Sequence, residues 1–368
     1  MADLFKNIYN EKFFTEFTNV LIKIVPNFNT ESFNNSIFSK EWKNMELKQR
    51  MRHITHTLNS HLTGSFQNKA TIILEMIDEL KRIGRKEESI EFMFLPDFIE
   101  VYGIENYDTS VKTFQEITQF TSCEFAVRPF LIKYPKQMVD QMKTWSMHKH
   151  AMVRRLSTEG CRPRLPWAMA IPSLKKNPAP ILPILEKLKN DASESVRRSV
   201  ANNLNDISKD NPDLVIKLAK KWKGISPEVD WLIKHACRTL LKQGNADVMQ
   251  LFGFGSVDAI KIENFTVLTP KVSIGKSLEF TFQLINTATD ALKLRVEYGL
   301  YYQKANGTLA KKVFKISEKM YPEKSTTTIN RKQSFKIITT RKFYLGKHQV
   351  SLIINGHEFP ALDFNLID

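Results

Sequence analysis

Two related stretches decide the fold: V-R-R-L-S-T-E-G-C-R-P-R-L-P-W at residues 153–167 and V-R-R-S-V-A-N-N-L-N-D at residues 196–206. Their Val-Arg-Arg blocks lie about 43 residues apart, and a weaker third copy begins about 37 residues later at Ile233. Periods near 40 residues are typical of HEAT-like repeats, in which each unit is a pair of helices. The sequence therefore predicts a stack of helix pairs.

A helical pattern extends through the first 250 residues or so. In residues 7–24, apolar side chains recur largely at intervals of three and four, and residues 71–83 form a second clear helix that Gly84 closes as a left-handed cap. Outer helices are expected at 180–189 and 212–223, and inner, basic helices at 196–204 and 233–241. Such pairs stack into a curved solenoid whose inner helices line a concave surface.

The chain changes character after residue 254. Residues 257–368 contain alternating runs such as L-E-F-T-F-Q-L-I, S-F-K-I-I and H-Q-V-S-L-I-I, and Asn355-Gly356 is a signal for a type I′ hairpin. Seven or so short strands predict a small immunoglobulin-like β-sandwich. The predicted fold class is mainly α, with a HEAT-like helical domain at 1–254 and the sandwich at 257–368.

Composition points to a polyanionic partner. The 368 residues carry a formal net charge of +15 and a pI near 9.5, although the hydrophobic (42%) and charged (25%) fractions are ordinary. Such a surplus favours nucleic acid or an anionic membrane surface. Three cysteines without a C-x-x-C pair, no signal-peptide pattern and no long apolar window predict a cytoplasmic protein without disulfides.

Several kinds of chemistry are disfavoured. His53, His56 and His61 lie close together, but they lack nearby carboxylate or Cys partners, so a helical surface is the better interpretation than a zinc site. No Gly-rich phosphate loop and no G-x-S-x-G elbow occurs. We expect no metal and no cofactor.

Three carboxylates are embedded in the basic helical region, at Glu124, Glu159 and Asp206. If the inner helices stack side by side, all three project onto one concave face. The alternative is that each is a helix cap or an ion-pair partner of a neighbouring Arg. Spacing alone does not rank them.

The sequence resembles a known family at these residues. C-E-F-A-V-R-P-F at 123–130, the 153–167 stretch and the 196–206 stretch are similar to the AlkC family of bacterial alkylbase DNA glycosylases, relatives of the AlkD HEAT-like group. The resemblance covers essentially the whole chain, because a C-terminal immunoglobulin-like domain occurs in one subset of that family. It implies excision of cationic bases, above all 3-methyladenine and 3-methylcytosine, from double-stranded DNA.

The resemblance also implies roles for particular residues. Glu124, Glu159 and Asp206 fall on the family's catalytic acids, and Trp167 falls on the aromatic that contacts the lesion nucleotide. A methylated base is already a good leaving group, so carboxylates need only stabilise an oxocarbenium-like sugar and activate water. We favour Glu159 for water activation, because Gly160 allows close backbone approach and the neighbouring arginines keep the carboxylate ionised. No lysine stands out as a Schiff-base nucleophile, so a monofunctional enzyme is expected.

Position in the repeat predicts the phosphate contacts. Basic side chains of the inner helices and the Pro-rich turn are expected to line the groove. The predicted contacts are Arg154, Arg155, Arg162, Arg164, Arg197, Arg198, Lys234, His235 and Arg238. In the sandwich, the basic loops at 304–307, 311–312 and 341–342 are further candidates. We expect a monomer, because a solenoid that closes on a duplex needs no partner subunit. Trp145, Trp222 and Trp231 are expected in the core of the solenoid.

Two alternatives stay open. The first is a HEAT-repeat scaffold that binds nucleic acid or protein without catalysis, since fold does not dictate function. The second is a glycosylase for another damaged base. A carboxylate and an aromatic in a Pro-rich turn on a basic groove argue against the scaffold, which has no need of them.

Overall fold

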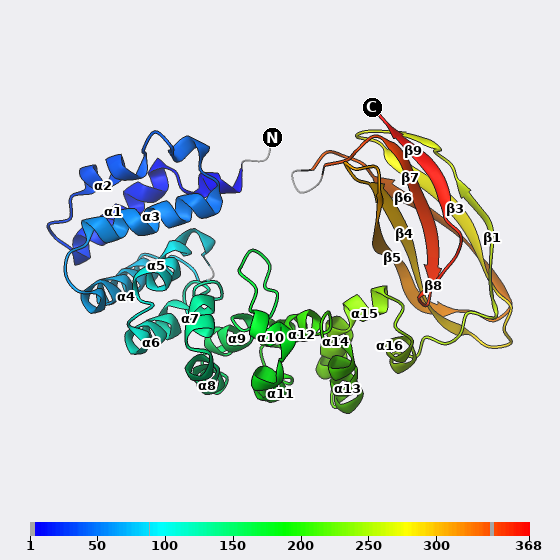
Figure 1. Cartoon of the computed structure of the whole chain (residues 1–368), viewed down its shortest axis with the longest axis horizontal. Coiled ribbons are helices and arrows are strands. Elements are labelled where there is room, and N and C mark those ends of the chain that lie inside the picture. The colour runs from blue at the N-terminus through cyan, green and yellow to red at the C-terminus, as the bar shows by residue number, and fades with distance from the viewer. Residues whose placement is uncertain (1–3, 88, 339–341) are drawn as a thin grey trace. The chain divides into compact units, whose positions relative to one another are not determined.

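The computed structural model of the chain describes residues 4–87, 89–338 and 342–368. Arg341, one of the candidate contacts in the sandwich, lies outside these ranges. Helices precede strands along the chain, which confirms the predicted fold class (Figure 1). The helices are α1 (Glu11–Ile24), α2 (Thr30–Ile37), α3 (Leu47–His61), α4 (Phe66–Arg82), α5 (Phe94–Tyr102), α6 (Tyr107–Ile117), α7 (Val127–Lys133), α8 (Pro135–Trp145), α9 (Ala151–Glu159), α10 (Pro172–Lys176), α11 (Leu182–Leu188), α12 (Glu194–Ile207), α13 (Pro212–Trp222), α14 (Pro227–Ala236), α15 (Arg238–Lys242) and α16 (Ala246–Leu251).

Local sequence signals set the helix ends. The Asn10 side chain accepts a hydrogen bond from the backbone N–H of Phe13 at 3.0 Å and so caps the start of α1. Gly84 has a φ of +90°, which confirms the left-handed cap after α4. The inner helix predicted at 233–241 is wrong in one respect, because α14 ends at Ala236 and α15 starts at Arg238. No Gly or Pro marks this break in the sequence.

Helices α9, α12 and α14 pack side by side as the inner layer, and α8 and α11 pack behind them (Figure 1). Among the described residues, no helix is long and apolar enough to cross a membrane. All three cysteines are buried and free.

The strands form two sheets. One has the order β1-β3-β6, and the other has the order β2-β9-β7-β4-β5, with β8 paired to β7. The predicted S-F-K-I-I strand is wrong: β6 ends at Ser334, and the strand is instead the polar stretch before it. The strands are β1 (Ile260–Val267), β2 (Lys271–Ser273), β3 (Ser277–Asn286), β4 (Leu292–Gln303), β5 (Leu309–Tyr321), β6 (Ser325–Ser334), β7 (Gly346–Ile354), β8 (His357–Glu358) and β9 (Leu362–Ile367).

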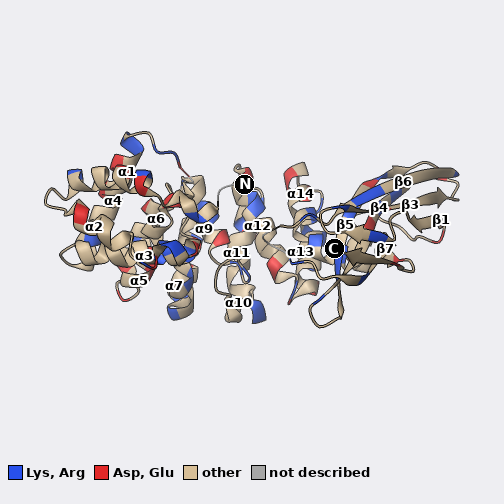
Figure 2. Ribbon diagram, turned by 90° about the horizontal axis from the view of Figure 1, so that it is seen from above, with Lys and Arg blue, Asp and Glu red and all other residues tan. Residues whose placement is uncertain are grey.

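One edge strand of each sheet is basic. Strands β5 and β6 end their sheets, and Figure 2 shows Lys and Arg along both of them. Charged side chains on an edge strand oppose edge-to-edge aggregation. Between β7 and β8, Asn355 and Gly356 both have positive φ, at 46° and 83°, which confirms the predicted type I′ turn.

The chain divides into two compact units. One runs to Val215 and includes Lys221–Ala236; the other comprises Ile216–Lys220 and the chain from Cys237 onward. Helices α15 and α16 therefore group with the sandwich. Close backbone contact explains this, because a Cβ on Gly356 would lie 2.5 Å from the Cα of Gly244. The division at 254–257 drawn from the sequence stays a prediction.

Candidate active site

The first arginines of the two Val-Arg-Arg blocks, Arg154 and Arg197, have the same structural role. The Nη1 atom of Arg154 donates to two backbone carbonyl oxygens, five and six residues earlier, at 2.8 and 2.9 Å. Arg197 repeats this arrangement at 3.0 and 2.6 Å. Each arginine thus fastens the turn that leads into its own helix, α9 or α12. The repeat seen in the sequence is a repeat of this contact.

Arg154 has little capacity left for a phosphate. Its Nε and Nη2 atoms also bond the two carboxylate oxygens of Asp191, at 2.6 and 2.9 Å, and the side chain is largely buried. A bidentate pair of this kind is among the stronger hydrogen-bonded contacts of a protein. We therefore assign Arg154 and Arg197 to holding the helices and leave them out of the proposed DNA surface.

A cavity of about 550 Å³ opens between α3, α5, the segment before α7, and α9. Its size is in the range of small-molecule sites. Most of its wall is apolar, and the Trp167 loop forms part of its rim. Its charged lining residues are Asp97, Glu100, Glu124, Arg155, Glu159 and Arg162.

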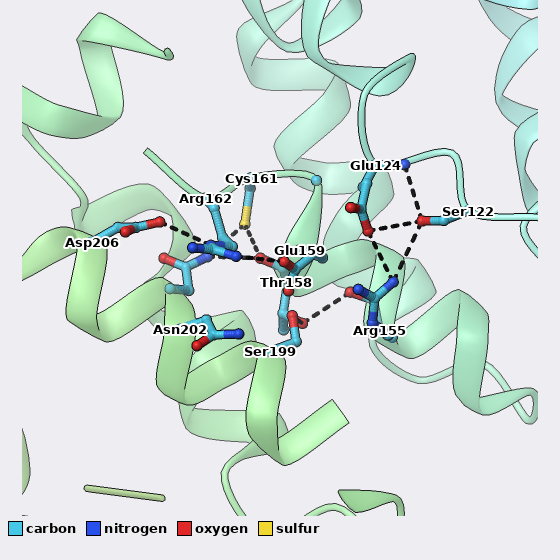
Figure 3. Close-up of polar contacts among 12 residues, drawn as sticks. Ser122, Glu124, Arg155, Thr158, Glu159, Cys161, Arg162, Ser199, Asn202 and Asp206 are labelled. Atoms are coloured by element: carbon cyan, nitrogen blue, oxygen red, sulfur yellow. Dashed lines mark hydrogen bonds and ion pairs between the residues drawn. The ribbon is translucent and has the colours of Figure 1, made fainter. Parts of the chain in front are cut away.

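Glu159 is the most distinctive group in this cavity. It ends α9 with a side chain only 6% exposed, and its Oε1 atom accepts a hydrogen bond from Nη1 of Arg162 at 2.6 Å (Figure 3). Among the described residues, its buried Oε2 atom has no hydrogen-bond partner. Buried polar atoms are nearly always paired, so an unpaired one at a cavity wall suggests a bound water or ligand.

Gly160 fixes the position of Glu159. A Cβ at residue 160 would lie 2.6 Å from Cγ2 of Val127 and 3.0 Å from the carbonyl oxygen of Leu156. Only glycine lets the end of α9 pack this closely against α7. The close approach at Gly160 is thus to a neighbouring helix, and the water-activating role of Glu159 stays a prediction.

Arg128 holds the loop that follows. Its fully buried guanidinium donates from Nε to the carbonyl oxygen of Met169 at 2.7 Å and from Nη1 to that of Gly160 at 2.9 Å. Burial lowers the pKa of Arg128 to about 10. Sequence reasoning did not assign this residue a role, although the C-E-F-A-V-R-P-F motif contains it. It clamps both ends of the Pro-rich turn.

Trp167 lies at the tip of this turn and is 67% exposed. Its φ of 65° is left-handed, which is strained for a bulky residue. The Nζ atom of Lys48 donates to its backbone oxygen and also lies 4.8 Å from the centroid of the Phe125 ring. Lys48 thus holds the Trp167 backbone in place, and the exposed ring is available to contact a bound partner molecule.

Glu124 shares the cavity with Glu159. Its Oε2 atom accepts from the Ser122 hydroxyl at 2.9 Å and pairs with Nη1 of Arg155 at 3.0 Å (Figure 3). Both side chains of the pair are about one fifth exposed. Arg155, expected at the phosphate backbone, thus lies at the cavity beside a carboxylate.

Asp206 is placed differently from the expectation that the three carboxylates share one face. It is 1% exposed and is not part of the cavity lining. Its two oxygens accept from Nε of Arg162 at 2.8 Å and from Nζ of Lys209 at 3.1 Å. Arg162 therefore lies between Asp206 and Glu159 (Figure 3). Asp206 orients the cation that holds Glu159.

A stack of side chains lies on α12 and α14. The guanidinium of Arg198, whose side chain is 52% exposed and pairs with Glu194, lies 5.2 Å from the ring centroid of Trp231. The Trp231 ring in turn stacks on His235 at 5.2 Å and 14°. Trp231 is 38% exposed, so its predicted place in the core is wrong, whereas Trp145 and Trp222 are buried as predicted.

The remaining predicted contacts are scattered. Arg164 forms a bidentate pair with Asp210 at 2.8 and 2.6 Å on the surface. Lys234 lies in α14, next to His235. Arg238 lies beyond the break at Cys237, in the second compact unit. Figure 2 shows the basic residues of α12 in this row of helices.

No metal site was found among the described residues, in which no group of three His, Cys, Asp or Glu side chains is arranged to hold an ion. The three clustered histidines bond to neighbours: His53 to Ser36 O at 3.0 Å, His56 to the Tyr102 hydroxyl at 2.7 Å, and His61 to Thr57 O at 2.9 Å. All three lie on α3, where His56 is exposed and His53 and His61 are half-buried.

The family of the chain follows from comparison with known proteins. The family model "DNA alkylation repair enzyme" matches residues 40–242, more than half of the chain, and the chain belongs to this family. A second family model, the C-terminal Ig-like domain of the uncharacterised protein YhaZ, matches residues 261–368. These two matches follow the order of helices and strands in the structure.

Two relatives cover the whole chain. The uncharacterized protein YhaZ of Bacillus subtilis (strain 168) is 43% identical over 366 residues, with 100% of both chains covered. The solved structure of Pseudomonas fluorescens alkylpurine DNA glycosylase AlkC, bound to DNA containing an abasic site analog, is 31% identical, with a TM-score of 0.92 and 100% of both chains covered. The resemblance to the AlkC family is thus confirmed.

Proposed function

We propose that this protein is a monofunctional DNA glycosylase that hydrolyses the bond between deoxyribose and a cationic alkylated base, 3-methyladenine or 3-methylcytosine, in double-stranded DNA. One observation carries the proposal: Glu159, a buried carboxylate in the lining of a cavity rimmed by the exposed Trp167, has one oxygen without a hydrogen-bond partner in the part of the chain that the structure describes. Membership of the DNA alkylation repair enzyme family and the likeness to AlkC support it.

The reaction needs little from the protein beyond electrostatics and a base. The C1′–N bond breaks, and its electron pair neutralises the cationic base as it leaves. The oxygen of a water molecule bonds to C1′, and a proton of that water passes to Oε2 of Glu159. Carboxylates near the sugar stabilise the developing oxocarbenium ion, as in glycoside hydrolysis.

The other residues divide the remaining work. Glu124 adds a second negative charge at the cavity, while Arg155 keeps it in place. Asp206 acts through Arg162, which fixes the orientation of Glu159. Trp167 contacts the lesion nucleotide, and its ring face attracts a cationic base by about 0.5 to 2 kcal/mol. This chemistry uses no cofactor or metal.

Phosphate contacts on the inner helices position the duplex. Of the predicted set, those on α12 and α14 fit this role best, because Arg198 is half exposed and has Lys234 and His235 on the neighbouring helix. The net charge of +15 supplies the long-range attraction. Because one copy of the chain carries all of these groups, we propose that the protein acts as a monomer.

Incubation with damaged DNA tests the proposal. Duplexes carrying 3-methyladenine, 3-methylcytosine or 7-methylguanine are treated with the protein, and free base and alkali-labile abasic sites are measured. We expect release of the first two bases and no strand cleavage without alkali. Tight binding to every duplex with no release of base would instead identify a nucleic-acid-binding scaffold.

A further inference from the structure

We propose that Asp97 and Glu100, on α5, form an acidic wall of the cavity that selects a positively charged base over a neutral one. The inference rests on the proposed glycosylase function and names the residues that set its specificity. Neither residue belongs to the motifs of the repeat. Both line the same cavity as Glu159.

The two carboxylates lie on one face of α5, three residues apart. Asp97 is 3% exposed and the Glu100 side chain is 17% exposed. A single nitrogen of Arg52, Nη2, pairs with both, at 2.8 Å to Asp97 and 2.9 Å to Glu100. The Thr55 hydroxyl donates to the other oxygen of Asp97 at 2.7 Å. One cation therefore serves a buried carboxylate and a partly buried one.

The charge balance around the cavity differs between its two walls. On the α9 side, Glu124 is matched by Arg155, while Glu159 and Asp206 share Arg162 and Lys209. On the α5 side, two carboxylates face one guanidinium. The lining as a whole holds four carboxylates and two guanidinium groups, within a chain that is strongly basic.

The Glu159 carboxylate adds a second observation within the described part of the cavity lining. Oε2 of Glu159 is buried and unpartnered among the described residues, and its side chain is 94% buried at the same cavity. Vacant acceptors and surplus negative charge both favour a ligand that carries positive charge and hydrogen-bond donors. The 3-methyladenine base carries such a positive charge while it is attached to the sugar and loses it on release. Neutral bases lose the charge attraction.

The titration of Glu100 agrees with this geometry. Burial, together with the adjacent Asp97 carboxylate, raises the pKa of Glu100 to about 7. A cation that enters the cavity favours the ionised form. The charged groups that face Glu100 are Arg52 and Lys48 on α3, Asp97 on α5, and, across the cavity, Glu124, Arg155, Glu159 and Arg162.

Binding to two nearly identical duplexes tests the proposal. One carries 3-methyladenine, which is cationic, and the other carries 3-deaza-3-methyladenine, a neutral isostere. The full chain is used in a Glu159→Gln background, so that base release does not interfere. We expect Glu100→Gln to lower the preference for the cationic duplex about 5- to 10-fold, with neutral binding unchanged.

Further variants separate selection from folding. Glu100→Asp should restore most of the preference, and Glu105→Gln, a surface carboxylate whose side chain is 73% exposed, should leave it unchanged. The preference for the cationic duplex should rise from pH 6 to pH 8 in the protein that retains Glu100, and it should not change with pH in Glu100→Gln. An unaltered preference in Glu100→Gln, or an equal loss of both affinities, would overturn the proposal. Absence of base release by the wild-type protein would instead count against the glycosylase function.

Discussion

The guanidinium of Arg162 donates a 2.6 Å hydrogen bond to Oε1 of Glu159, a residue that lines the cavity. The second oxygen of that carboxylate is buried and has no hydrogen-bond partner among the described residues. Asp206 accepts from Nε of the same guanidinium at 2.8 Å. Two acids, one cation and one vacant acceptor thus form a unit. The unit orients the Glu159 carboxylate through one of its oxygens and leaves the other for the role proposed above.

The Arg162→Met variant should lose both activity and stability. Removing the cation leaves two buried carboxylates without their main partner, which costs on the order of 3 to 5 kcal/mol. Denaturant unfolding measures the loss, and single-turnover base release measures the activity. Asp210→Asn, which breaks the exposed pair with Arg164, is the control and should change stability by less than about 1 kcal/mol. Equal effects of the two variants would contradict this role for Arg162.

The Gly160→Ala variant should displace the end of α9. Its Cβ would lie 2.6 Å from Val127 and 3.2 Å from Met142, so overpacking should cost about 1 to 3 kcal/mol. Base release should fall as well, because Glu159 and Arg162 flank this position. Thermal unfolding of Gly255→Ala provides the comparison, since nothing lies within 4 Å of that site. If Gly160→Ala were as stable as wild type, the end of α9 would be free to move away from α7, which would contradict the close packing described here.

The Trp167→Gly variant should separate activity from stability. The ring is 67% exposed and its φ of 65° suits glycine, so the melting temperature should not fall. Release of 3-methyladenine should drop about tenfold, in line with the loss of an aromatic contact of about 1 kcal/mol or more. An unchanged rate would mean that the ring does not touch the lesion nucleotide.

The titration of Glu100 should contribute to the pH dependence of the free energy of unfolding. The folded protein binds the proton of this carboxyl up to about pH 7, whereas an unperturbed Glu has a pKa of 4.5. Stability therefore falls as pH rises from about 4.5 to 7. Glu100→Gln removes this fall, so the variant should gain on the order of 2 kcal/mol relative to wild type between pH 5 and pH 8. Urea unfolding at pH 5 and pH 8 measures the free energy of unfolding of wild type, Glu100→Gln and the control Glu105→Gln. A difference between Glu100→Gln and wild type that is the same at both pH values would refute this prediction.

The two arginines of each repeat should behave differently in DNA binding. Arg198→Ala should weaken binding and reduce the slope of log affinity against log salt by about 1, as expected for one lost phosphate contact. Arg154→Ala should leave that slope unchanged and lower stability, because its bonds to Asp191 are internal. Titrations at several salt concentrations distinguish the two. The same change of slope for both variants would contradict the assignment.

Much of the fold could be predicted from the sequence because periodicity records burial. The Val-Arg-Arg spacing predicted the repeated helices, and the Asn355-Gly356 pair predicted its turn. The break at Cys237 and the polar strand β6 could not be predicted in this way. No Gly or Pro marks the first, and the second lacks an apolar face and gains its register from β3.

The candidate site was only partly predictable. Glu159, Glu124 and Trp167 could be singled out by their setting in a basic helical region, and a resemblance supplied their roles. The structure places them at one cavity. Asp206 lies behind Arg162, which spacing along α12 cannot reveal. Arg128 lies within the C-E-F-A-V-R-P-F motif but had no predicted role, and Asp97 and Glu100 carry no sequence signal apart from ordinary helical positions. Their importance depends on which helices pack around the cavity.

The single-turnover rate of Glu159→Gln on duplex DNA containing 3-methyladenine tests the central claim most directly. Glutamine keeps the shape of the side chain but removes its charge and its basicity. We predict that the rate falls by about 10² to 10³, comparable to the loss of one catalytic electrostatic group, while the Kd for the duplex changes by less than about threefold. A rate within a factor of a few of the wild-type rate would contradict the account.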